Sequence, residues 1–209
     1  MQAISRLHEF SVSEEDMAKL DDAIRMHTMH YANDGFQVIA VEKELEHVFD
    51  IDGKRILLTG RVDLVVKWKD DYFIVDHKTT KWIISKVAES LSVSDQATGY
   101  IALWNKLYPE YYATGVIFNI IKLEGRISGG DPIKDLRREI VYRSKDDIKE
   151  FLLDIHETSE EIAQKLKHPR WVKDRNACYL YNHRCEYADL CAGANPDNLI
   201  GIAFKEEDE

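Results

Sequence analysis

Three side chains on two neighbouring segments have the chemistry of a metal-dependent site: Asp63, Asp76 and Lys78. Carboxylate oxygens are hard ligands, which suit Mg²⁺ or Mn²⁺. An ammonium group beside a bound ion can stabilise the negative charge that develops during a reaction. A third acid, Glu42, lies one segment earlier and has the same chemistry. Whether these groups act together depends on the elements that position them.

The segments that carry these side chains are predicted strands. Residues 60–66 and 73–78 are rich in Val, Ile and Phe, and a Lys-Asp-Asp turn lies between them. Because side chains on a strand alternate between faces, Asp76 and Lys78 share one face. A hairpin centred on the Lys-Asp pair places Asp63 directly opposite Asp76.

A preceding strand extends this arrangement to a third acid. It joins the next strand through Asp52-Gly53, a dipeptide typical of the two-residue type I′ hairpin. That turn places Glu42 opposite Asp63 and Glu44 opposite Arg61. Like charges directly opposite each other are destabilising, and a divalent cation would remove the repulsion. The alternatives are a sheet edge whose acids are solvated and a β-bulge that breaks the row.

These residues resemble a known family. Gly60-x-x-Asp63 followed by Asp76-x-Lys78 resembles the motif of the PD-(D/E)XK nuclease superfamily, and Gln96-x-x-x-Tyr100 resembles the extra motif of its RecB-like exonuclease branch. That branch includes phage exonucleases and CRISPR-associated RecB-like nucleases, and the likeness covers roughly residues 36–105. It implies an α/β fold with a restriction-endonuclease-like core, in which helices flank a mixed central sheet.

The resemblance also implies roles for individual residues. The catalytic set is Asp63, Asp76, Lys78, Gln96 and Tyr100. Asp63 and Asp76 would hold Mg²⁺ or Mn²⁺, and the backbone carbonyl of His77 would add a ligand. Glu42 and His8 are further candidate ligands. His27 and His30 are alternatives, although a lone helical histidine is more often a surface or core residue.

The remaining elements follow from capping and periodicity. Ser13-x-x-Asp16 predicts the start of a helix that reaches about Tyr31, and Ser94 predicts the start of a helix over 95–108. The apolar run 113–123 predicts a buried central strand that is parallel to its neighbour, because it follows a helical crossover. A short strand is expected over 138–142, followed by a helix to about Lys167. The inward residues of that helix should be Ile148, Leu152, Ile155, Ile162 and Leu166.

Three cysteines, Cys178, Cys185 and Cys191, lie near the C-terminus. They resemble the C-terminal cysteines that hold an iron–sulfur cluster in the RecB-like branch. Three thiolates are one ligand short of such a cluster or of a four-coordinate zinc site, and no cysteine precedes them. His183 is a local candidate for the fourth ligand, a missing N-terminal segment is another explanation, and three reduced thiols are the alternative. We therefore predict a nuclease-like domain over 1–170 and a cysteine segment over 171–209, packed on the same domain.

Composition indicates a globular chain with an uneven charge distribution. The chain has 209 residues, 44% of them hydrophobic, and a net charge of −10. No apolar run reaches the roughly 20 residues of a membrane span, and no secretory signal is evident, which favours a cytoplasmic location. Basic residues that could contact DNA are Lys81, Lys165, Lys167, Arg170, Lys173 and Arg175, and Arg184 extends that basic stretch. A solvated helix end is the alternative.

The leading hypothesis is a metal-dependent nuclease that hydrolyses DNA phosphodiester bonds. The family resemblance favours an exonuclease that acts on DNA ends in repair or recombination, within or beside a larger complex. A second hypothesis is a non-catalytic DNA-binding module on a nuclease fold. A third is an interaction protein whose cysteine segment binds zinc.

Overall fold

The computed structural model describes residues 13–123, 131–167, 173–180 and 183–195. The chain divides into two compact units, Met1–Ser159 and Glu160–Glu209. Each unit is described by itself. The packing of a cysteine segment on the first domain therefore stays a prediction.

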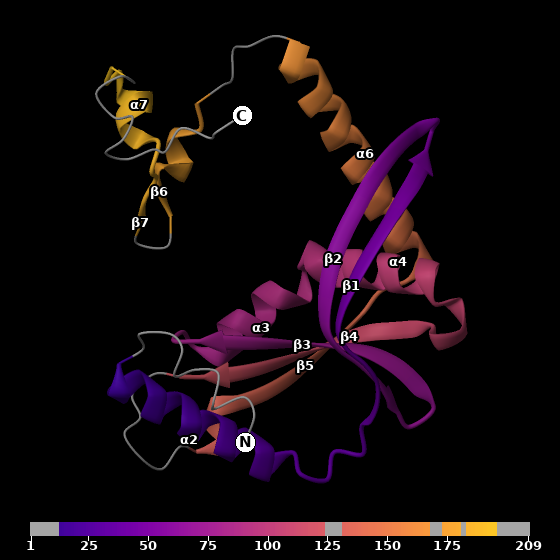
Figure 1. The fold of residues 1–209 in the computed structure, drawn as a ribbon, viewed down its shortest axis with the longest axis vertical. Helices are drawn as coiled ribbons and strands as arrows, with labels where there is room; N and C mark the ends of the chain where they lie inside the picture. Colours follow the sequence, from indigo (N-terminus) through magenta and orange to yellow (C-terminus); the bar gives the residue numbers. More distant parts are fainter. Residues whose placement is uncertain (1–12, 124–130, 168–172, 181–182, 196–209) are drawn as a thin grey trace. The chain divides into compact units, whose positions relative to one another are not determined.

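One mixed sheet forms the centre of the first unit. Its strands are β1 (Gln37–Ile51), β2 (Lys54–Trp68), β3 (Asp71–Thr80), β4 (Ala113–Lys122) and β5 (Leu136–Tyr142). The five strands lie in the order β1-β2-β3-β4-β5. Only β3 and β4 are parallel, and the other neighbouring pairs are antiparallel. The predicted fold class is thus confirmed, and Figure 1 shows β1 and β2 extending together beyond the rest of the sheet.

Turn chemistry sets the strand register. Asp52 and Gly53 both have positive φ, as a type I′ turn requires. Glu44 lies opposite Arg61, as predicted. The second hairpin pairs Trp68 with Asp71, also as predicted.

Helices flank the sheet. They are α2 (Glu14–His30), α3 (Ile84–Ser92), α4 (Asp95–Leu107), α5 (Pro132–Asp135) and the part of α6 (Lys145–Lys167) that belongs to the first unit, with a 3₁₀ turn η1 (Pro109–Tyr111). Ser13 and Ser94 accept the expected capping hydrogen bonds at the starts of α2 and α4. Helix α3 was not predicted, although Ile84, Val87, Ala88 and Leu91 have helical spacing.

Two apolar clusters lie on the opposite faces of the sheet. The larger joins buried residues of α4, such as Ile101 and Trp104, to alternating strand residues such as Ile74. The smaller contains Val66, Phe73, Val75 and Ile117. Strand β4 is buried and parallel to β3, as expected, but β3 occupies the centre of the sheet.

Helix α6 differs from its predicted packing. Ile162 is 47% exposed and Leu166 is 70% exposed, so the expected inward positions of both residues are wrong. Ile148, Leu152 and Ile155 are half-buried. The helical spacing of apolar residues continues to Leu166, but among the predicted inward residues only those up to Ile155 are partly covered by their surroundings.

The second unit contains short elements. They are η2 (Arg175–Cys178), β6 (Tyr179–Leu180), β7 (His183–Arg184) and α7 (Ala188–Ala192). Strands β6 and β7 form a two-stranded antiparallel sheet. Among the described helices of both units, none is long and apolar enough to cross a membrane.

Candidate active site

The end of β3 places a buried carboxylate beside an ammonium group. Asp76 is buried, and its Oδ2 atom lies 2.7 Å from Lys78 Nζ. The two residues share one face of the strand, as their spacing predicted. Apart from this ion pair, Asp76 Oδ2 accepts no hydrogen bond from the residues that the structure describes.

Asp63 lies where β2 and β3 separate. The ladder between them runs from Trp68–Asp71 to Leu64–Val75, and Asp63 is the next residue. Its Oδ2 atom accepts a hydrogen bond of 2.8 Å from the backbone N–H of His77. This hydrogen bond holds the Asp63 carboxylate against the backbone of His77, the residue that lies between Asp76 and Lys78 in the sequence.

Opposing influences act on the Asp76 carboxyl group. Burial is the largest and raises its pKa, whereas the hydrogen bond and the charge of Lys78 lower it. The nearby charge of Asp63 raises the pKa again. The paired ladder ends at Leu64–Val75, one position before the predicted opposition of Asp63 and Asp76.

Helix α4 supplies two further polar groups. Gln96 Nε2 donates to Tyr100 Oη at 2.8 Å and lies 3.4 Å from Asp76 Oδ1, a long contact. Burial raises the pKa of Tyr100, and the charges of both aspartates raise it further. Gly60 of β2 lets the Tyr100 ring lie close to the strand, because a Cβ atom at position 60 would be 3.3 Å from that ring.

Glu42 does not complete the expected row of three acids. Its neighbours keep the predicted register, with Val41 opposite Leu64 and Lys43 opposite Val62. Glu42 itself has φ of 48°, and its carboxylate accepts hydrogen bonds from Arg61. A local left-handed backbone therefore gives this acid another partner, and its role as a metal ligand stays a prediction.

The His77 side chain points away from this carboxylate pair. Its Nδ1 atom lies 3.0 Å from Asn119 Nδ2, which is also 2.6 Å from His27 Nε2. Sequence reasoning missed Asn119, although a polar residue inside an apolar strand was a usable signal. Of the other candidate histidines, His30 is exposed, and His8 lies outside the described residues.

The donor set at Asp63 and Asp76 suits a hard divalent cation. No group of three or more His, Cys, Asp or Glu side chains within the described ranges is arranged to hold a metal. Mg²⁺ does not need such a cage, because one or two carboxylates, water and substrate phosphates usually complete its coordination. Two mutually repelling carboxylates, one of them buried, therefore fit Mg²⁺ or Mn²⁺.

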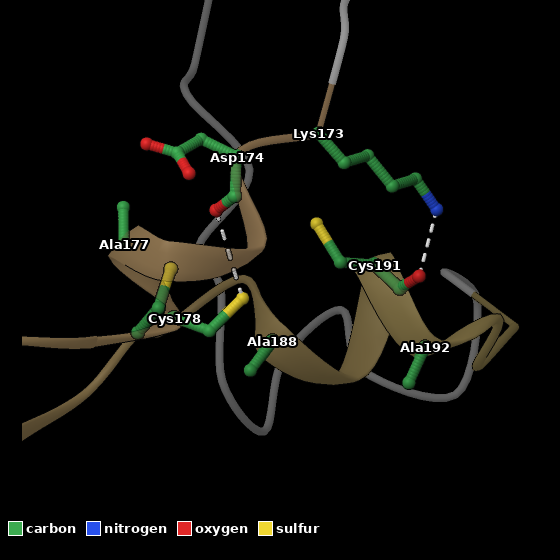
Figure 2. Close-up of a pocket in the computed structure, with 8 residues that line it drawn as sticks. Lys173, Asp174, Ala177, Cys178, Ala188, Cys191 and Ala192 are labelled. Carbon is green, nitrogen blue, oxygen red and sulfur yellow. Dashed lines mark hydrogen bonds between the residues drawn. The ribbon is translucent and has the colours of Figure 1, made fainter.

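The three cysteines line one pocket in the second unit. Figure 2 shows Cys178 and Cys191 on its walls, together with Lys173 and Asp174. Cys185 is the third cysteine of this lining, and all three thiols are free. Among the described residues, no three His, Cys, Asp or Glu side chains are grouped to hold a metal, so a cluster or zinc site at these cysteines stays a prediction. The side chain of His183, the candidate fourth ligand, lies outside the described residues.

The predicted DNA-contacting residues have different surroundings. Lys81 and Lys167 are exposed, and Lys165 lies 3.7 Å from Glu161. Lys173 Nζ donates to the backbone oxygen of Cys191 at 2.7 Å. Arg170 and the side chain of Arg175 lie outside the described residues.

Comparison with known proteins agrees with the fold. A family model described as the PD-(D/E)XK nuclease superfamily matches residues 4–192. No curated protein matches the chain. A solved structure described as "Crystal structure of SSO0001" is similar at a TM-score of 0.39 and 14% identity, and the match covers 73% of this chain and 62% of that chain. That likeness is too low to carry an argument about function. Because the family model spans most of its length, the chain belongs to the PD-(D/E)XK nuclease superfamily.

Proposed function

We propose that this protein is a Mg²⁺- or Mn²⁺-dependent deoxyribonuclease that hydrolyses phosphodiester bonds at DNA ends. The observation that carries this proposal is the ion pair of 2.7 Å between buried Asp76 and Lys78, with Asp63 fixed beside it. A sequence selected for stability alone has no reason to bury an acid next to a second acid. A hydrolytic site needs such an arrangement.

Asp63 and Asp76 would hold the cation, together with the backbone carbonyl of His77. A bound divalent cation polarises the phosphate and lowers the pKa of a bound water. The N–H group of His77 orients the Asp63 carboxylate through its hydrogen bond. Lys78 is oriented by Asp76, so its ammonium group can orient the attacking water or stabilise charge on the phosphate oxygens.

Tyr100 has the properties of a hydrogen-bond donor to the substrate. Its oxygen accepts from Gln96, which leaves the hydroxyl proton available. The raised pKa keeps that proton in place near neutral pH. Tyr100 would therefore donate to a phosphate oxygen, and Gln96 would hold the phenol in position.

The preference for DNA ends rests on the RecB-like motif at Gln96 and Tyr100. Exposed Lys81 follows β3 directly and would contact the DNA backbone. The basic residues of 165–175 belong to the second unit and would contact the DNA backbone from there, because Lys and Arg neutralise phosphates. A role in repair or recombination, within a larger complex, is part of the same proposal.

Digestion of end-labelled linear DNA and closed circular DNA tests the proposal. We expect linear DNA to be degraded with Mg²⁺ or Mn²⁺, circular DNA to persist, and a chelator to stop the reaction. Cleavage of the circle would contradict the need for an end while supporting hydrolysis. Binding of DNA without cleavage under every metal condition would overturn the enzyme assignment and favour a non-catalytic module.

A further inference from the structure

A polar row crosses the sheet on the face opposite the carboxylates. His77 of β3 lies opposite Asn119 of β4, which lies opposite Arg138 of β5. Asn119 is a polar residue in a mostly apolar strand, and it is only 1% exposed. Burying an amide is costly unless its hydrogen bonds are satisfied. The side chains that hydrogen-bond to the Asn119 amide therefore indicate the role of this residue.

Two imidazoles converge on the amide nitrogen of Asn119. His27 Nε2 lies 2.6 Å from Asn119 Nδ2, and His77 Nδ1 lies 3.0 Å from it. An amide nitrogen has two N–H donors and no acceptor, so both imidazole nitrogens accept. Each ring is then neutral, with its proton on the other nitrogen. Burial lowers the pKa of His27 and so favours the neutral ring, while the hydrogen bond with Asn119 acts in the opposite direction.

Arg138 completes the network on the other side of the amide. Its Nε atom lies 3.4 Å from Asn119 Oδ1, and its Nη2 atom donates to Asp34 at 2.7 Å. The guanidinium group also stacks on the ring of Tyr31 at 3.7 Å. Both groups of the Asn119 amide thus have partners, and helix α2 contributes one of them through His27.

Among the described residues, His77 links this network to the proposed catalytic face. His77 lies between Asp76 and Lys78 in the sequence, and its backbone N–H holds Asp63 at 2.8 Å. Its ring is held by Asn119 on the opposite face. His77 and Asn119 are also paired in the β3–β4 ladder, so the ring contact and the ladder together hold this part of the β3 backbone, whose N–H points at Asp63.

We infer that Asn119, supported by His27, is a positioning residue that sets the orientation of Asp63 through His77. This inference rests on the proposed function for its catalytic consequence. Outer partners of this kind typically change metal affinity or activity by about 10- to 100-fold when they are removed. Asn119 touches no substrate and is not a catalytic residue.

Substitution of Asn119 by Leu tests this inference with little change in shape, because both side chains branch at Cγ. We expect exchange of the His77 amide hydrogen to accelerate at least about tenfold, since the amide loses its fixed orientation. The dissociation constant for Mn²⁺, measured by calorimetry without DNA, should rise about 10- to 100-fold. In cleavage assays kcat should fall, while KM for DNA changes little.

Two further variants separate positioning from a general loss of stability. Asn105→Leu removes another half-buried amide, which bonds to both the N–H and the C=O of Ala113 at the start of β4. It should lower the melting temperature without changing His77 exchange or Mn²⁺ affinity. Asn119→Asp restores both histidine contacts with donor and acceptor reversed, because each imidazole can place its proton on the facing nitrogen. It should recover part of the Mn²⁺ affinity.

The outcomes distinguish this inference from the proposed function. If the wild-type protein cuts no DNA, the proposed function fails, and His77 exchange still decides whether Asn119 positions this residue. If Asn119→Leu leaves His77 exchange and Mn²⁺ affinity as in the wild type, the inference is wrong. Should that variant not fold, His27→Leu removes the outer partner, and unchanged exchange in it overturns the inference equally.

Discussion

Replacing Lys78 with Met removes the ammonium group and keeps an apolar stem of similar length. If Lys78 stabilises charge on the phosphate, the cleavage rate should fall about 10²- to 10³-fold, which corresponds to about 3–4 kcal/mol in the transition state. The substitution also leaves the Asp76 carboxylate buried without the cation that lies 2.7 Å away. Both consequences follow from the same contact.

The cost in stability has an upper limit. Breaking a buried ion pair typically costs about 3–5 kcal/mol. Lys78 retains 30% exposure of its side chain, and the carboxyl group can take up a proton, so we expect about 1–3 kcal/mol at pH 7. Burial without the opposing Lys78 raises the pKa of Asp76 further. The variant is therefore less stable than the wild type mainly at pH values above that raised pKa. The difference in unfolding free energy disappears as pH falls towards 3.8, the pKa of Asp76 in the unfolded chain.

The assays are single-turnover cleavage with Mg²⁺ and urea unfolding in chelator between pH 4 and pH 8. Lys86→Met is the matched control, because Lys86 contacts Glu89 at 3.0 Å on the surface of α3. We expect the control to change unfolding by less than about 0.5 kcal/mol and to leave cleavage unchanged. Cleavage by the Lys78→Met variant within twofold of the wild type would refute the proposed role.

Three other perturbations have defined outcomes. Asp63→Asn should weaken Mn²⁺ binding at least about tenfold in calorimetry, because it removes a charged ligand, and unchanged affinity would exclude Asp63 as a ligand. Burial lowers the pKa of His27 below 6.5, so its contribution to unfolding free energy is complete above pH 6.5 and is lost as pH falls through the folded value. An NMR titration midpoint at or above 6.5 would contradict this. Gly115→Ala would place a Cβ atom 2.7 Å from the backbone oxygen of Val141, so we expect a loss of about 1–3 kcal/mol in urea unfolding, and unchanged stability would contradict this packing.

Local chemistry was sufficient to predict the part of the site that lies on the hairpins. Asp52-Gly53 and the turn after Trp68 each fix a register, and a fixed register determines which side chains oppose each other. The contact between Asp76 and Lys78 follows from strand alternation alone. These predictions succeeded because they needed no knowledge of distant packing.

The features that sequence reasoning missed depend on distant residues or on local backbone strain. Asn119 gains its meaning from His27, which lies 92 positions away in the chain. Glu42 adopts a left-handed φ that its residue type does not favour, so alternation could not locate its carboxylate. Ile162 and Leu166 have the correct helical spacing but no covering element among the described residues.

Strand β1 lies at one edge of the sheet and is 15 residues long. An open edge of this length could template pairing with another molecule and so cause aggregation. Its exposed residues include Glu42, Lys43, Glu44 and Glu46. A second copy that approached this edge would bring the same excess of acids against it, and this repulsion opposes the pairing of two copies through β1.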